Sequence, residues 1–206
     1  MSAATKALIV ADPVLGSEKS LAFPPLAQTM REGEAIAARF RAAVLLTGAR
    51  ATLSSLERHR PDAGILHFAG HGFSNAGNGG LLLAPEGSDA PEAGVLDGKR
   101  MAAGNWSRSR LAVLSACSTG TGENRGPVNP ESLVRGILWA GVARVVATRW
   151  NVDAENSVRF MDRFYDTLLS GDGVARSLQR AAQLLRENER TRHPYFWAGF
   201  QSFGTR

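Results

Sequence analysis

Two apolar segments of this chain each end in a chemically active residue followed by small residues. Residues 64–70 lead into His71 and Gly72, and residues 111–116 lead into Cys117, which is the only cysteine of the sequence. Short apolar runs that end at turn-forming residues are typical of buried strands. Because the carboxyl ends of parallel strands meet at one edge of a sheet, we expect His71 and Cys117 to lie close together.

A thiol beside an imidazole is a nucleophilic pair. The thiolate attacks well near neutral pH, and the imidazole can take its proton and later return it to a leaving group. The alternative is that Cys117 is a buried small hydrophobe without chemistry. The strand, the turn and the partner histidine together favour the nucleophilic interpretation.

Strand-like and helix-like segments alternate along the chain, which predicts an α/β fold with a doubly wound, mostly parallel sheet. A glycine-rich stretch at 72–80, followed by an apolar stretch at 81–84, predicts a short hairpin after the histidine strand. The other expected strands cover residues 7–11, 43–46, 111–117, 143–148 and 195–203, and the expected helices cover 26–40, 52–58, 97–103, 131–140, 153–169 and 173–188.

Length and cysteine content restrict the class of protein. The chain has 206 residues, of which 44% are hydrophobic and 21% charged, as in an ordinary globular domain. A single cysteine cannot form an internal disulfide, which favours a reducing compartment. No segment approaches the roughly 20 apolar residues that cross a bilayer, and the first residues do not resemble a signal peptide. We therefore expect a cytoplasmic protein without a membrane partner.

The positive charge of the chain does not indicate nucleic-acid binding. The formal charge is +5, and seven arginines lie between residues 159 and 192. Five acidic residues are interspersed with them in the same segment. This mixture is typical of a solvated helix surface, whereas a nucleic-acid interface would place the arginines on one face.

Four segments carry a resemblance to a known family: HFAGHG at 67–72, LSACSTG at 114–120, WNVD at 150–153 and HPYFWAGF at 193–200. In this order and spacing they resemble the CHAT family, which is similar to caspases and separases. The resemblance covers nearly the whole chain. One position departs from the family pattern, because the residue after the cysteine is often Glu and is Ser118 here.

The resemblance implies a caspase-like three-layer sandwich and a cysteine endopeptidase that uses a Cys–His dyad on a protein substrate. By position, Cys117 is the nucleophile and His71 is the general base and then the acid, without a catalytic carboxylate or a cofactor. The resemblance also implies gating by a sensor module or partner protein. We expect one domain over residues 1–206, either a stand-alone effector or a fragment of a longer protein.

Three other residues are candidates around the dyad. The tetrahedral intermediate of such a reaction needs donors for its oxyanion, and the backbone amides of Gly72 and Cys117 are the candidates. His67 has the same strand parity as His71, so it is either a supporting residue behind His71 or a satisfied core histidine. A zinc site built from His67, His71 and Cys117 would lack a fourth ligand with suitable spacing, so we expect no metal.

Substrate selection is the least determined property. Trp150 and Asp153 follow the strand next to the cysteine strand, where Asp153 could bind a basic substrate side chain and Trp150 could form an apolar wall. Asp153 also stands at an expected helix start, where Asp is a preferred cap. Both roles are compatible.

Two alternatives to an active endopeptidase remain open. The first is a catalytically quiet interaction module that keeps the family fold, against which the presence of both His71 and Cys117 argues. The second is a cysteine hydrolase that acts on a non-peptide substrate.

Overall fold

The computed structural model of the chain describes residues 1–206 except 17–21, 76–77, 88–93, 118–129 and 205–206. Its main sheet runs in the spatial order β2-β1-β3-β6-β7-β8. Neighbouring strands from β2 to β7 are parallel, and β8 is antiparallel to β7 at the edge. The predicted mostly parallel sheet is confirmed. The strands are β1 (Ala7–Pro13), β2 (Ala43–Gly48), β3 (Ile65–Asn75), β6 (Leu111–Cys117), β7 (Arg144–Thr148) and β8 (Phe200–Gly204).

Strand β3 is longer than its neighbours and serves two sheets. Its first part pairs with β1 and β6, and from Gly72 onward it pairs antiparallel with β4 (Asn78–Leu82). Strand β4 in turn pairs with β5 (Val95–Asp97), a short strand that the sequence pattern did not predict. The hairpin expected after the histidine strand is therefore confirmed.

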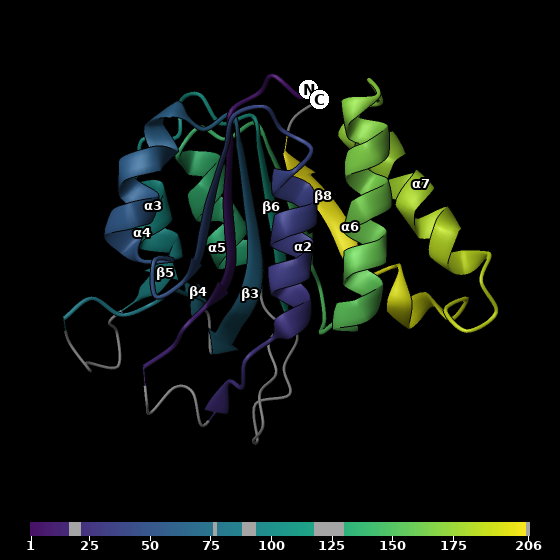
Figure 1. Ribbon diagram of the computed structural model, residues 1–206, viewed down its shortest axis with the longest axis horizontal. Helices are drawn as coiled ribbons and strands as arrows, with labels where there is room; N and C mark the ends of the chain where they lie inside the picture. The colour runs from purple at the N-terminus through teal and green to yellow at the C-terminus, as the bar shows by residue number, and fades with distance from the viewer. Residues whose placement is uncertain (17–21, 76–77, 88–93, 118–129, 205–206) are drawn as a thin grey trace.

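Helices cover both faces of the main sheet (Figure 1). Strand alternation divides the apolar side chains between these faces. In β3, Leu66 and Phe68 are buried in the cluster under α3, α4 and α5, whereas Ile65 belongs to the cluster under α2, α6 and α7. Each such buried side chain contributes about 1.5–3 kcal/mol. The three-layer sandwich is confirmed. The helices are α2 (Ala27–Ala37), α3 (Leu53–His59), α4 (Gly98–Ala102), α5 (Pro130–Trp139), α6 (Ala154–Leu169) and α7 (Val174–Arg186).

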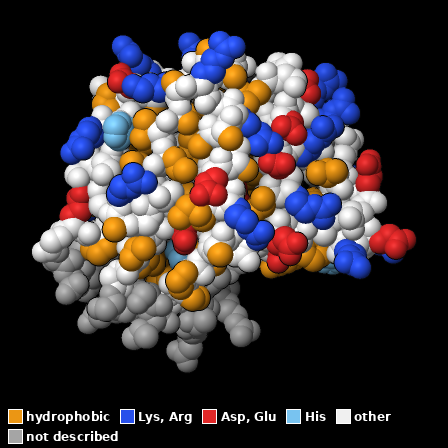
Figure 2. All heavy atoms as spheres, in the orientation of Figure 1, with side chains coloured by type: hydrophobic (Ala, Val, Ile, Leu, Met, Phe, Trp, Pro, Cys, Tyr) orange, Lys and Arg blue, Asp and Glu red, His pale blue; other side chains and the backbone are white. Residues whose placement is uncertain are grey.

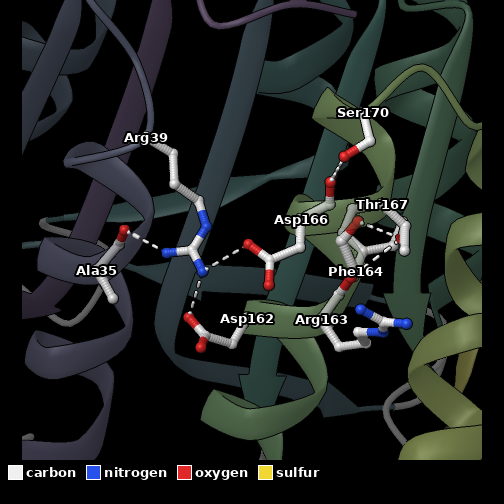
Figure 3. Close-up of polar contacts among 8 residues, drawn as sticks. All are labelled: Ala35, Arg39, Asp162, Arg163, Phe164, Asp166, Thr167 and Ser170. Carbon is white, nitrogen blue, oxygen red and sulfur yellow. Dashed lines mark hydrogen bonds and ion pairs between the residues drawn. The ribbon is translucent and has the colours of Figure 1, made fainter.

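An arginine clamp holds α2 against α6 (Figure 3). Arg39, just beyond the last turn of α2, donates to Asp162 at 2.8 Å and to Asp166 at 3.0 Å, and also to the carbonyl of Ala35 at 2.8 Å. The two carboxylates are one helical turn apart on α6 and about half exposed, so each ion pair contributes at most about 1 kcal/mol. The clamp links the C-terminal end of α2 to one face of α6.

The C-terminal segment departs from the prediction. The expected strand at 195–203 begins only at Phe200, and residues Pro194–Phe196 form a 3-10 turn. The proline starts this turn, and Nδ1 of His193 accepts the Tyr195 amide at 3.2 Å, which leaves the Tyr195 side chain 42% exposed. His193 and Pro194 together fix this turn.

Charged side chains of both signs are interspersed over the face of the molecule shown in Figure 2. The view does not contain a broad field of a single sign. In the part of the chain that the structure describes, the helices are too short or too polar to cross a membrane.

Candidate active site

His71 and Cys117 are register partners in the parallel pair formed by β3 and β6. The ladder begins with Ile65 opposite Leu111 and ends with His71 opposite Cys117. Adjacent strands lie about 4.8 Å apart, so the backbones of the two residues are immediate neighbours at the carboxyl end of the sheet. The structure therefore brings together the two residues that the sequence predicts as a pair.

The imidazole of His71 is held on one side by the segment that precedes α2. Its Nε2 lies 2.7 Å from the carbonyl oxygen of Pro24, and its ring centroid lies 5.3 Å from that of Phe23. A carbonyl oxygen only accepts hydrogen bonds, so Nε2 carries the hydrogen. In the neutral ring the lone pair is then on Nδ1, which is the nitrogen able to accept a proton.

Burial also sets the protonation state of His71. The side chain is 5% exposed, and its burial lowers the pKa of the imidazole below the ordinary value of 6.5. The Pro24 carbonyl and the negative charge of Asp12 oppose this effect without cancelling it. His71 is therefore neutral at neutral pH, which is the form that a general base requires.

A threonine on β7 fixes the end of the cysteine strand. The β6–β7 register ends with Leu114 opposite Ala147, and beyond this point Thr148 Oγ1 donates to the carbonyl of Ala116 at 3.0 Å. The Thr148 side chain is 3% exposed, so this bond is shielded from water. The bond extends the hydrogen-bonded region to the residue directly before Cys117.

Gly72 lies where β3 passes from the main sheet into the hairpin. A Cβ atom at this position would lie 3.3 Å from both the Cβ of Ala116 and the carbonyl oxygen of Gly80. This spacing is tighter than most real contacts, so the absence of a side chain allows β3, β4 and β6 to approach. The oxyanion role expected for the Gly72 and Cys117 amides remains a prediction.

His67 belongs to a buried polar network. Its Nε2 lies 3.0 Å from Glu32 on α2, and its Nδ1 lies 3.1 Å from the hydroxyl of Tyr165 on α6. Burial, and then the charge of Glu32, raise the pKa of Tyr165 well above 10, so the phenol keeps its proton and donates to Nδ1. Nε2–H then donates to Glu32.

The network bears on the two interpretations of His67. Both ring nitrogens are engaged by Glu32 and Tyr165, so a hydrogen bond from His67 to His71 has no donor or acceptor left. His67 thus ties β3 to α2 and α6. A supporting role of His67 behind His71 remains a prediction. The described residues also hold no group of three or more His, Cys, Asp and Glu side chains placed to bind a metal ion.

Trp150 and Asp153 both have structural partners. The Trp150 Nε1 donates to the carbonyl of Tyr195 at 3.0 Å, and a Cβ atom at Gly199 would lie 3.2 Å from the indole. Asp153 Oδ1 accepts the backbone amide of Asn156 at 2.9 Å, which confirms the helix cap. Contact of either residue with substrate remains a prediction.

An open pocket of about 580 Å³ lies beside the capped start of α6. Its lining carries two acidic and two basic residues, so its charge does not select one class of ligand. The lining residues are Glu155, Asn156, Arg159, Asn188, Glu189, Arg190 and Thr191.

The sequence pattern does not assign Phe23, Pro24 or Thr148 to the site. The segment around Phe23 and Pro24 lies between the expected strand at 7–11 and the expected helix at 26–40. One available signal was its position: it follows the first strand of a parallel sheet, and such loops lie at the edge that carries His71 and Cys117. Nothing in the sequence indicates a role for Thr148 in the site, because threonine is common at the ends of strands.

Comparisons with known proteins agree with this fold. The Arg-specific cysteine proteinase gingipain R superposes with a TM-score of 0.59 at 13% identity, covering 98% of this chain and 46% of that one. A complex of the Porphyromonas gingivalis RgpB pro- and mature domains gives a TM-score of 0.59 at 12% identity, with 98% and 48% covered. This chain thus spans about half the length of those structures. The search among curated protein sequences gave no significant match.

At such low identity the superpositions establish the fold alone, which this chain shares with the gingipain structures. The sequence itself establishes the family. The CHAT domain model matches residues 1–205, almost the complete chain, in agreement with the resemblance carried by the histidine and cysteine segments. The chain belongs to the CHAT domain family.

Proposed function

We propose that this protein is a cysteine endopeptidase with Cys117 as nucleophile and His71 as general base and acid. The observation that carries the proposal is the pairing of His71 with Cys117 at the last position of the β3–β6 ladder. The neutral His71 imidazole, with its hydrogen on Nε2 and its lone pair on Nδ1, supplies the required base.

In the proposed reaction Nδ1 of His71 takes the proton of the Cys117 thiol, and the sulfur attacks the carbonyl carbon of the scissile peptide bond. The Gly72 and Cys117 amides donate to the oxyanion of the tetrahedral intermediate. When the C–N bond breaks, His71 returns the proton to the leaving amine. Water, deprotonated by His71, then attacks the thioester, and the acid product leaves as the thiol is restored.

The proposed specificity is for a basic side chain before the scissile bond. Asp153 is half-buried, and its cap bonds to Asn156 use Oδ1. A partly desolvated carboxylate pairs best with Arg or Lys. The Arg-specific gingipain is an example of a fold relative that takes a basic residue. Trp150, held at the end of β7, would form the apolar wall of the pocket.

We further propose that residues 1–206 form one peptidase domain and that a sensor module or partner protein controls its activity. The gingipain structures are about twice as long as this chain, and one of them is a complex with a pro-domain. Such a complex is an example of a fold relative held by another protein segment.

The proposal is tested by cleavage of a peptide library with the unmodified chain, Cys117→Ala and His71→Ala. Both variants should lose at least about a thousandfold in kcat/KM, because a nucleophile and its base act as a unit. His59→Ala, on the last turn of α3, is the matched histidine control and should keep full activity. Substantial turnover by Cys117→Ala would overturn the proposal, and so would equal activity of His71→Ala and His59→Ala.

A further inference from the structure

Asp12 has an unusual backbone conformation at the edge of the sheet that carries the site. Among the described residues it is the one non-glycine residue with positive φ, at 44°. It stands in a bulge of β1, because Ala11 pairs with Thr47 and Pro13 already pairs with Gly48. Asp tolerates this left-handed region better than most residues, since its short side chain can form a local hydrogen bond.

The Asp12 side chain holds the segment that contacts His71. Its Oδ1 accepts the backbone amide of Leu26 at 3.2 Å. Leu26 is the residue before α2 and has no side-chain cap hydrogen bond of its own. Two residues earlier, the carbonyl of Pro24 accepts the Nε2 hydrogen of His71 at 2.7 Å. A continuous chain of contacts therefore runs from Asp12 through residues 23–26 to the imidazole.

Asp12 also acts on His71 through its charge. The negative carboxylate favours the imidazolium and raises the pKa of His71, whereas burial lowers it. The segment 22–26, packed against the ring, contains no titratable side chain, and β6 contributes Cys117 as the register partner. Among the described charged groups, Asp12 is the one found to act on this histidine.

We propose that Asp12 is a positioning residue for His71: its bulged backbone and its bond to Leu26 fix the Pro24 carbonyl that orients the imidazole. The consequence for catalysis rests on the proposed peptidase function. The positioning of the His71 imidazole by Asp12 does not rest on that function. The experiment therefore has one readout for the position of His71 and another for catalysis.

Two substitutions divide the roles of the Asp12 side chain. Asp12→Asn tolerates the same φ and keeps an oxygen that can accept the Leu26 amide, but it removes the charge. Asp12→Gly permits the backbone conformation and removes both the bond and the charge. Asp62→Asn is the charge control, since Asp62 is exposed and pairs with Lys6. Asn105→Gly is the bond control, since its Oδ1 accepts the Ser107 amide at 3.2 Å.

The first readout is the NMR titration of the His71 ring in a Cys117→Ala background, which removes the neighbouring thiol. Asp12→Asn should lower the midpoint of His71 relative to the parent, and Asp62→Asn should leave it unchanged. Asp12→Gly should in addition shift the resonances of the neutral His71 ring, because the loss of the Leu26 bond releases the segment that holds the imidazole. Ring resonances of Asp12→Gly identical to those of the parent would overturn the positioning role. This result does not depend on peptidase activity.

The second readout is peptide cleavage near pH 8, where His71 is neutral. Asp12→Gly should lose about tenfold or more in kcat, because a misplaced catalytic group costs one to two orders of magnitude. Asp12→Asn should stay within about threefold of the unmodified chain, because it retains the positioning bond. Equal kcat values for Asp12→Gly and Asn105→Gly would overturn the positioning role. An unmodified chain that cleaves nothing would contradict the proposed function instead.

Discussion

His71 and Cys117 are the final register pair of the β3–β6 ladder, at the point where β3 leaves the parallel sheet. Both backbones therefore belong to regular strands in the middle of the main sheet. Groups carried on such strands are held more accurately than groups on loops. The register, which apolar packing on both faces fixes, brings the two residues side by side.

The reactivity of Cys117 should depend on His71. In the unmodified chain the imidazole can take the thiol proton, so iodoacetamide should label Cys117 rapidly near neutral pH. His71→Ala should label at least tenfold more slowly, and His193→Ala should label at the rate of the unmodified chain. The measurement is the pseudo-first-order labelling rate by mass spectrometry. Equal rates in the unmodified chain and His71→Ala would show that the two residues are not coupled.

His71 should titrate below its ordinary pKa. Because burial lowers the pKa of His71 in the folded state, the unfolded state binds more protons as the pH falls below the ordinary value of 6.5. The free energy of unfolding of Cys117→Ala should therefore fall with decreasing pH in this range, and it should be fully restored above it.

Urea unfolding of Cys117→Ala at several pH values measures this dependence. Adding His71→Gln to the same background should flatten it, since glutamine does not titrate. If the free energy of unfolding of the double variant falls with pH as steeply as that of Cys117→Ala, groups other than His71 cause the acid sensitivity.

Thr148 should affect the reactivity of Cys117. Thr148→Val keeps the shape of the side chain but removes the donor to the Ala116 carbonyl, which costs about 1–3 kcal/mol and loosens the strand end before Cys117. We expect a several-fold lower rate of Cys117 labelling in the folded protein. Thr167→Val is the control, because Thr167 donates to Arg163 within α6. The two variants should differ in labelling, and identical labelling would remove Thr148 from the site.

One substitution distinguishes substrate binding by Asp153 from its role as a helix cap. Asp153→Asn keeps the cap, because Asn caps a helix nearly as well as Asp. If the carboxylate binds a basic side chain, its loss should cost about 2 kcal/mol, or thirtyfold in kcat/KM, on an Arg peptide and little on a matched Leu peptide. An unchanged Arg-to-Leu ratio would leave Asp153 as a cap alone.

The sequence pattern predicts the sheet well because buried parallel strands are continuous apolar runs, as in residues 64–70 and 111–116. It also predicts helix starts at residues 97 and 153, where Asp97 and Asp153 cap their helices through local hydrogen bonds. It could not predict that His71 contacts Pro24, because that contact joins residues 47 positions apart through an irregular segment. The final strand was predicted too early for a related reason: residues 194–196 are as apolar as a strand, but Pro194 and His193 fix a turn there.

The central claim is that Cys117 cleaves peptide bonds. The most direct measurement is a profile of new protein N-termini in a lysate of the host cell, treated in parallel with the unmodified chain and with Cys117→Ala. We expect a defined set of cleavage sites that appears only with the unmodified chain, enriched in Arg or Lys before the cut. The same sites at the same intensity in both samples would contradict the assignment of Cys117 as the nucleophile.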